Sequence, residues 1–205
     1  MATNNVSTFL STINQGIKPN MFSVDINFPG GSDFTNSDKQ LTNILCKSAA
    51  LPGSNLGVIE VPFRGRTVKI AGDRTFDTWT ATFFADANME VRALFEDWAN
   101  NINSHEGNTA PRFLPNGSSD GYMADLFVSQ LEKDAEVGGS VIRTYHLHHC
   151  FPTNVSAIDL AYDSNDQVSE FTVEWQYSFF TAGVGDVGKA TGTKLSSGAS
   201  TRDVV

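Results

Sequence analysis

The segment 167–180 constrains the fold more than any other part of the chain. Over residues 171–179 a large apolar side chain and a polar side chain alternate at every step. The apolar positions are Phe171, Val173, Trp175, Tyr177 and Phe179. Successive side chains of a β-strand point to opposite faces, so this pattern predicts one long strand, 167–180, with one buried face. A chain that contains such a strand must also provide partner strands and a core.

Several other segments have the alternation or the apolar run that is typical of strands. The predicted strands are 22–28, 41–51, 58–63, 67–71, 74–85, 122–131 and 141–151, followed by a shorter apolar segment at 155–162. Turn-forming pairs of Pro and Gly or of two Gly separate several of them. The strand at 74–85 has aromatic residues on both faces, which indicates that both faces are covered.

The hydrophobic period changes in one segment, 89–103. Its apolar residues recur at helical spacings, and Asn88 precedes them as a candidate N-cap. These apolar residues are Val91, Leu94, Phe95, Trp98 and Ile102. The sequence therefore predicts one substantial helix, whose apolar stripe packs on a sheet.

Seven or eight strands with one helix indicate a mainly β (β+α) protein. We expect two packed antiparallel sheets, or a β-barrel-like sandwich, with one flanking α-helix. The 205 residues allow one main domain, 20–180, after an N-terminal segment 1–19. Residues 104–121 have the Gly, Pro, Ser and Asn content of a loop insertion. Residues 181–205 are rich in Gly, Ser and Thr, which is typical of a flexible tail.

Charge and composition disfavour several classes of protein. The 23 acidic and 14 basic residues give a formal net charge of −9, so the positive charge on which nucleic-acid binding depends is missing. With 18% charged and 11% aromatic residues, the bulk of the chain is neither disordered nor a coiled coil. We expect no membrane insertion and no signal peptide, because no apolar run has the required length and flanks. Cys46 and Cys150 are accordingly expected to be reduced, buried thiols.

Residues His146, His148 and Cys150 alternate, which places three possible metal ligands on one face of a predicted strand. Neighbours at i and i+2 lie roughly 7 Å apart, an awkward separation for sharing one tetrahedral ion. Ordinary strand packing is therefore favoured over a zinc site. Two glycine-containing motifs, at 183–188 and 117–121, lack the surroundings of a nucleotide site or a serine nucleophile. We expect no catalytic residue, no cofactor and no metal.

Five sequence strings occur in an order that is familiar from one family. They are CKSAALP (46–52), VKIAGDRTFDTWTATFFAD (68–86), VRALFEDW (91–98), FPTNVSAIDLAYD (151–163) and the strand 167–180. Together they resemble the tail tube proteins of contractile-tailed bacteriophages, which are related to the tubes of type VI secretion systems and pyocins. The resemblance extends from about residue 20 to residue 180. Its most specific part is AGDRTFDxW followed by RxxFExW in the predicted helix.

This resemblance implies a non-enzymatic structural protein of the virion tail, assembled in the cytoplasm of the host bacterium. Copies of the chain would form hexameric rings, and the rings would stack into a hollow tube inside a contractile tail sheath. The implied partners are further copies, the sheath, the tape measure protein, and the baseplate and tube-terminator proteins. The implied role is conduction of phage DNA into the host.

Segments 58–63 and 67–71 are expected to form a hairpin, in which Gly65 supplies the positive φ of a tight turn. Pro62 cannot donate a backbone hydrogen bond, which favours a free edge. We interpret this hairpin as an arm that reaches a neighbouring subunit; the alternative is a hairpin that stays exposed to solvent. The candidate interface residues are Pro62, Phe63, Arg64, Gly65, Arg66, Lys69, Asp73 and Arg74.

The net charge of −9 per copy predicts an acidic lumen, through which DNA would pass without binding. The tail 181–205 would either order against a neighbouring subunit or stay disordered. Two other functions remain open. One is a tube subunit of a bacterial contractile injection system. The other is a carbohydrate-recognising β-sandwich of a virion, in which Trp79 or Trp98 would stack on sugar rings.

Overall fold

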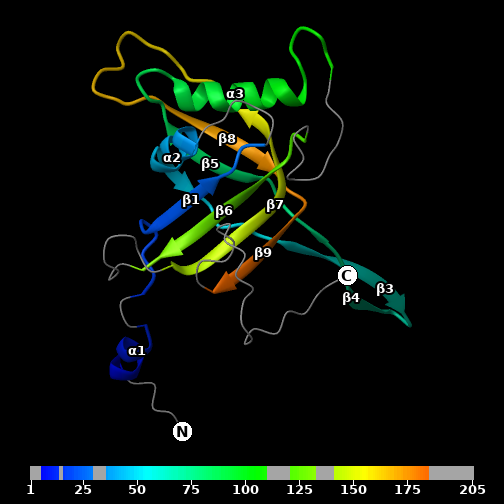
Figure 1. The fold of residues 1–205 in the computed structure, drawn as a ribbon. Coiled ribbons are helices and arrows are strands. Elements are labelled where there is room, and N and C mark those ends of the chain that lie inside the picture. Colours follow the sequence, from blue (N-terminus) through cyan, green and yellow to red (C-terminus); the bar gives the residue numbers. More distant parts are fainter. Residues whose placement is uncertain (1–5, 14–15, 30–35, 110–120, 133–140, 185–205) are drawn as a thin grey trace.

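A computed structural model describes residues 6–13, 16–29, 36–109, 121–132 and 141–184 (Figure 1). Within these ranges lie three helices, α1 (Val6–Ile13), α2 (Asn36–Ile44) and α3 (Glu90–Ile102). The same ranges contain nine strands: β1 (Phe22–Ile26), β2 (Cys46–Ala49), β3 (Asn55–Phe63), β4 (Arg66–Thr75), β5 (Trp79–Phe84), β6 (Ala124–Leu131), β7 (Val141–Val155), β8 (Glu170–Gln176) and β9 (Phe179–Val184). The predicted mainly β fold is confirmed, with two more helices than expected. No helix in this part of the chain is long and apolar enough to cross a membrane.

Seven strands pair antiparallel in two sheet halves that share β7. The first half contains β1, β6, β7 and β9, and the second contains β2, β5, β8 and the C-terminal end of β7. Strand β7 can belong to both halves because it is 15 residues long and bends between its two sets of partners. Strands β3 and β4 pair only with each other and form a separate two-stranded sheet.

One hydrophobic core lies between the two sheet halves and α3. Its largest fully buried side chains are Trp98, Trp175, Phe83, Phe95 and Phe171. The rings of Phe83 and Phe95 lie 5.1 Å apart, and those of Phe95 and Trp175 lie 5.6 Å apart in an edge-to-face arrangement. Trp98 is buried on α3 as predicted, and its indole N–H donates to the carbonyl oxygen of Tyr122 at 2.8 Å. Aromatic contacts of this kind add to the stabilisation from burial alone.

Helix α3 forms where the sequence predicted a helix, but Asn88 is not its N-cap. The residue before the helix is Met89, which has a φ of 58° and no capping side chain. The carboxylate of Asp86 accepts hydrogen bonds from the backbone N–H groups of Glu90 (3.0 Å) and Val91 (3.2 Å) instead. Burial raises the pKa of Asp86, but the backbone hydrogen bonds outweigh it and bring that pKa below its ordinary value. The negative charge lies at the positive end of the helix dipole.

The prediction of a strand at 41–51 is wrong, except for the part that forms β2. The first residues of that segment, 41–44, belong to α2; Leu41 in the helix and Leu45 directly after it lie about one helical turn apart and pack against the core. This spacing fits a helix as well as a buried strand, and periodicity alone does not distinguish the two over so short a segment. The side chain of Asn43 holds α2 against β1, because its Oδ1 accepts a hydrogen bond from the backbone N–H of Ile26 at 3.1 Å.

For the strand predicted at 167–180, the burial pattern is confirmed from Phe171 to Tyr177, but the strand is not continuous. Strand β8 ends at Gln176, and the backbone N–H of Ser178 donates to the carbonyl oxygen of His148 at 3.0 Å. The chain then continues as β9, which pairs with the first part of β7. Phe179 consequently lies outside the core and is 40% exposed.

Other strand boundaries also differ from the prediction. The segment 74–85 is interrupted, because β4 ends at Thr75 and β5 begins at Trp79. Between them Phe76 packs against Tyr177 and Phe180, with ring centroids 5.6 and 5.7 Å apart. Strand β7 extends to residue 155, and the following segment, 156–169, contains no strand.

The terminal and loop predictions are tested only in part. Residues 181–184, predicted as the start of a flexible tail, belong to β9. Residues 185–205 and 110–120, which make up most of the predicted tail and insertion, lie outside the described residues. Both cysteines are free, and Cys150 is buried as predicted, but the predicted burial of Cys46 is wrong because its side chain is partly exposed.

Asp86→Ala should lower the free energy of unfolding by about 1 kcal/mol at neutral pH, because two N–H groups of α3 lose their acceptor. A folded-state pKa below the unfolded value gives stability that is present at higher pH and is lost as the pH falls through it. The difference between variant and wild type should therefore shrink in acid. Urea denaturation at several pH values measures both effects. Asn88→Ala is the matched control, and an equal loss for both variants would contradict the assigned cap.

Candidate functional site: a projecting hairpin and a histidine cluster

Strands β3 and β4 form a hairpin that projects from the two sheet halves (Figure 1). We refer to this hairpin, residues 55–75, as the arm. Every residue of both strands is exposed except Gly72, which is partly exposed. A hairpin that packs on its own subunit has one buried face, whereas both faces of the arm are open.

A tight turn closes the arm where the sequence predicted it. Arg64 has a φ of 48° and Gly65 a φ of 81°, and positive φ at two successive positions is typical of a type I′ turn. The twist of this turn matches the twist of the two strands. The strands are longer than the predicted segments 58–63 and 67–71, and Arg66 is the first residue of β4.

Two glycines allow the strands to approach closely near the base of the arm. A Cβ atom on Gly72 would lie 3.2 Å from the carbonyl carbon and oxygen of Gly57. The register of the two strands shifts next to this contact, between Leu56 and Val58. Gly57 and Gly72 therefore permit a bulge where the arm leaves the body of the subunit.

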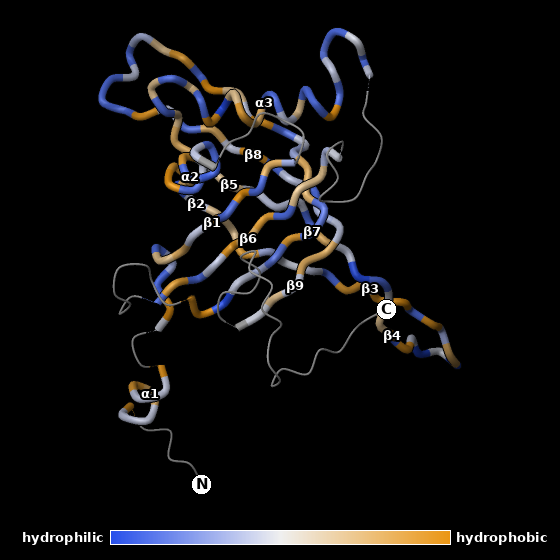
Figure 2. The backbone as a smooth tube through the Cα atoms, viewed as in Figure 1, coloured by the Kyte–Doolittle hydropathy of each residue, from blue (hydrophilic) through white to orange (hydrophobic). Residues whose placement is uncertain are grey.

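Cross-strand pairing gives the arm one apolar face. Ile59 pairs with Ile70, and Val61 pairs with Val68, so the members of each pair share a face. With Phe63 these residues form a continuous surface, and their exposed fractions lie between 41% and 61%. Figure 2 shows apolar stretches along the arm. We refer to these five residues as the apolar face.

The opposite face of the arm is polar at its centre. Lys69 Nζ lies 3.4 Å from a carboxylate oxygen of Glu60, directly across the two strands. Both side chains are more than half exposed, so this ion pair contributes little to stability.

The predicted interface residues separate into three places. Pro62, Phe63, Arg64, Gly65 and Arg66 gather at the tip of the arm, Lys69 lies on the polar face, and Asp73 and Arg74 lie near the base. Sequence reasoning missed four members of the apolar face, namely Ile59, Val61, Val68 and Ile70. The alternation along both strands was a signal for them, but it was interpreted only as evidence for strands.

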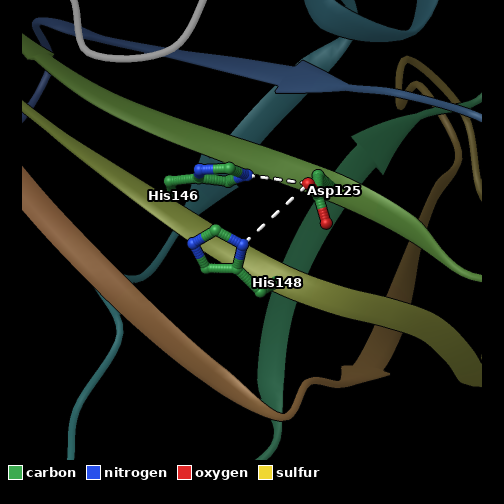
Figure 3. Close-up of side chains that lie close together, drawn as sticks. All are labelled: Asp125, His146 and His148. Carbon is green, nitrogen blue, oxygen red and sulfur yellow. Dashed lines mark hydrogen bonds and ion pairs between the residues drawn. The ribbon is translucent and has the colours of Figure 1, made fainter. Parts of the chain in front are cut away.

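A second group of polar side chains lies on the face of β6 and β7 that points away from the core. His146 Nε2 lies 3.0 Å from Asp125 Oδ2, and His148 Nδ1 lies 4.0 Å from the same oxygen (Figure 3). The three side chains are 20% to 27% exposed. We refer to them as the histidine cluster.

Cys150 does not share a face with His146 and His148, so that part of the prediction is wrong. His149 has a φ of 58°, and the pairing of β6 with β7 shifts register at this point. The additional residue places both Leu147 and Cys150 in the core. Burial raises the pKa of the Cys150 thiol.

An aromatic ring stacks on each outer face of the pair of imidazoles in the cluster. Phe127 stacks on His146 at 4.2 Å, His146 lies 3.7 Å from His148, and Phe179 stacks on His148 at 4.4 Å. Burial, followed by the proximity of His146, lowers the pKa of His148 to about 4, so this ring is neutral at pH 7. Burial raises the pKa of Asp125, but hydrogen bonds and the nearby histidines lower it overall. At neutral pH the cluster therefore contains an ionised carboxylate next to an imidazole that is not protonated.

The two tryptophans considered for sugar stacking are buried. Trp79 is 2% exposed and Trp98 is 0% exposed. The indole N–H of Trp79 donates to the carbonyl oxygen of Ala50, which fixes the ring inside the subunit. Neither ring presents a face to solvent, so the structure gives no support to a carbohydrate site at these residues.

Two tail tube proteins are similar to this chain in sequence. The tail tube protein gp19 of Enterobacteria phage T4 is 33% identical over 156 residues, which cover 76% of this chain and 85% of gp19. A tail tube protein of Serratia phage KSP90 is 27% identical over 154 residues, which cover 75% of this chain and 81% of that protein.

A solved chain of the PVC sheath–tube complex, an extracellular contractile injection system in the extended state, has the same fold. Its TM-score is 0.56 at 16% identity, with 89% of this chain and 99% of that chain covered. The family model described as phage tail tube protein matches residues 17–182. The chain therefore belongs to the phage tail tube protein family.

Proposed function

We propose that copies of this chain form hexameric rings, which stack into the inner tube of a contractile tail and conduct DNA into the host bacterium. The observation that carries this proposal is the arm, whose apolar face is open in the isolated subunit. The solved proteins with the same fold come from a sheath–tube complex, a sheath/tube terminator and a baseplate. We infer that a sheath, a baseplate, a terminator and a tape measure protein are the partners of this tube.

The arm has the properties of a contact between subunits. A two-stranded hairpin is at best marginally stable alone in water, and exposed apolar strands promote association. Burying half-exposed Ile, Val and Phe side chains on a neighbouring copy contributes on the order of 1 kcal/mol for each side chain. Five such residues on every arm act together, and the same contact is repeated around and along a tube.

The sheet edges supply a second means of association. Strands β1 and β2 end the order of paired strands, and β9 has β7 as its partner within the described part of the chain. Pairing such edges between neighbouring copies in a closed ring removes free edges, which otherwise favour aggregation. We infer that the first sheet half joins its counterparts in the ring around the channel.

The negative charge suits a conduit for DNA. At −9 per copy, a wall made of many subunits repels phosphate groups, so DNA gains no affinity from released counterions and slides freely. Catalysis has no part in this function.

A tube of a bacterial contractile injection system is the second candidate. The shared fold with an extracellular injection system favours it. The sequence relatives favour a phage, because the T4 and KSP90 proteins are much more similar to this chain than the injection-system tube is. The cargo distinguishes the two: assembled particles that eject DNA support the phage tail.

Replacing the apolar face should prevent assembly without unfolding the subunit. In the triple variant Ile59→Thr, Val61→Thr and Val68→Thr the β-branched shape is kept and the apolar contact is lost. Wild type should form hollow tubes or six-membered rings in negative-stain electron microscopy, with or without baseplates as templates, and the variant should remain dispersed. Val58→Thr, exposed on the other face, is the matched control. Normal tubes from the triple variant, or none from wild type with baseplates, would contradict the proposal.

The charged tip provides an independent test. Arg64→Glu with Arg66→Glu should raise the protein concentration needed for polymerisation, because the predicted contact residues reverse their charge. Light scattering over a concentration series measures this threshold. Lys39→Glu, which makes half of this charge change on α2, is the control for an effect of net charge alone. Tubes of normal yield and stability from the double variant would show that the tip makes no charged contact between subunits.

A helical reconstruction of the tube by cryo-electron microscopy should show a channel wall with net negative charge. The acidic balance of the chain is the reason for this expectation. A channel wall with net positive charge would contradict the proposed free passage of DNA.

A further inference from the structure

The histidine cluster brings three metal-ligating groups from two neighbouring strands to one place. Asp125 belongs to β6, and His146 and His148 belong to β7. One ligand atom from each residue lies within 4.8 Å of the other two. Figure 3 shows both rings turned toward the same carboxylate.

These separations are close to those around a zinc ion. Ligand bonds of about 2.0–2.1 Å in a tetrahedral arrangement place the ligand atoms roughly 3.4 Å apart. The measured separations from Asp125 Oδ2 are 3.0 Å to His146 Nε2 and 4.0 Å to His148 Nδ1. Residues at i and i+2 of a strand are too widely spaced at their Cα atoms, but these two rings lean together until their centroids lie 3.7 Å apart.

Neighbouring groups already hold two of the three ligands in position. Thr181 Oγ1 lies 3.1 Å from His148 Nε2, so it orients the ring and leaves Nδ1 facing Asp125. The backbone N–H of His149 donates to Asp125 Oδ1 at 3.1 Å, which leaves Oδ2 facing the two rings. Partners that fix the second atom of each ligand are typical of metal sites in proteins.

We propose that Asp125, His146 and His148 bind one zinc ion through Asp125 Oδ2, His146 Nε2 and His148 Nδ1, with water as the fourth ligand. Two imidazoles and one carboxylate suit a first-row transition metal and do not suit magnesium or calcium. The ion fixes β6 to β7 beside the bulge, where β7 passes from one sheet half to the other. By linking two strands of the body of the subunit, the bound ion stabilises the folded state.

Zinc binding to the full-length chain without a polyhistidine tag tests this proposal. After treatment with a chelator and dialysis, isothermal titration calorimetry with zinc chloride should give one ion per chain. At a free zinc concentration 100 times Kd, the melting temperature should rise by roughly 5–10 °C. Cobalt(II) should give the visible absorption of a tetrahedral site, and magnesium should give no heat and no shift. Absence of zinc uptake would overturn the proposal.

Two variants distinguish loss of the zinc site from loss of the fold. Asp125→Asn keeps the oxygen that accepts the His149 N–H, and His148→Phe keeps a flat ring between His146 and Phe179. Each should weaken zinc binding by at least about tenfold and lower the zinc-dependent rise in melting temperature by about half or more at the same zinc concentration, while circular dichroism without metal stays like that of wild type. His105→Ala, an exposed histidine near the end of α3, is the matched control and should bind zinc normally. Wild-type affinity in both cluster variants, or loss of binding in the His105 variant, would overturn the assignment.

Discussion

Strand β7 is the element on which the rest of the subunit depends, because it pairs with β6, β8 and β9. Its change of partner coincides with the bulge at His149, a non-glycine residue with positive φ. Such a conformation persists only where surrounding interactions fix it. Here Asp125 of the neighbouring strand accepts the His149 backbone N–H. The same bulge moves Leu147 and Cys150 into the core and leaves two histidines on the other face, so one local irregularity determines both the packing and the cluster.

The body and the arm of the subunit rest on different physical interactions. The body has a closed aromatic core, with Trp98, Trp175 and Phe95 almost fully removed from solvent. The arm has no core of its own and holds its shape through cross-strand pairs and a tight turn. An extended element that keeps its apolar side chains in water is unfavourable in a monomer. In an assembly the same element provides contact area that the body does not have to supply.

Local patterns in the sequence predicted most strands, the helix α3 and the hairpin turn, because these features depend on neighbours along the chain. The burial of Phe171, Val173 and Trp175 follows the predicted pattern without exception. The predictions that were wrong concern segments whose structure is fixed by residues far away in the sequence. The helix at 36–44 is held by Asn43 against β1, and the break after β8 is fixed by the carbonyl of His148.

The site shows the same division between local and distant signals. The tip of the arm was predicted from Gly65 and its neighbours, which are adjacent in sequence. The histidine cluster could not be predicted correctly from the sequence. Its carboxylate comes from a different strand, and the bulge places Cys150 on the opposite face of β7 from His146 and His148. Convergence of side chains across strands is a property of register, and a single sequence carries little information about register.

The physical separation of arm and body has a genetic consequence under the proposed function. The arm contributes none of the core side chains, so a defect confined to it leaves a subunit that still folds and still presents normal edges to its neighbours. Although it does not assemble by itself, such a subunit would join intact copies through these edges. Since each proposed ring contains several copies, a minority of defective chains would reach most rings. Alleles with damage in the arm are therefore dominant in a mixed infection, whereas alleles that disrupt the aromatic core are recessive.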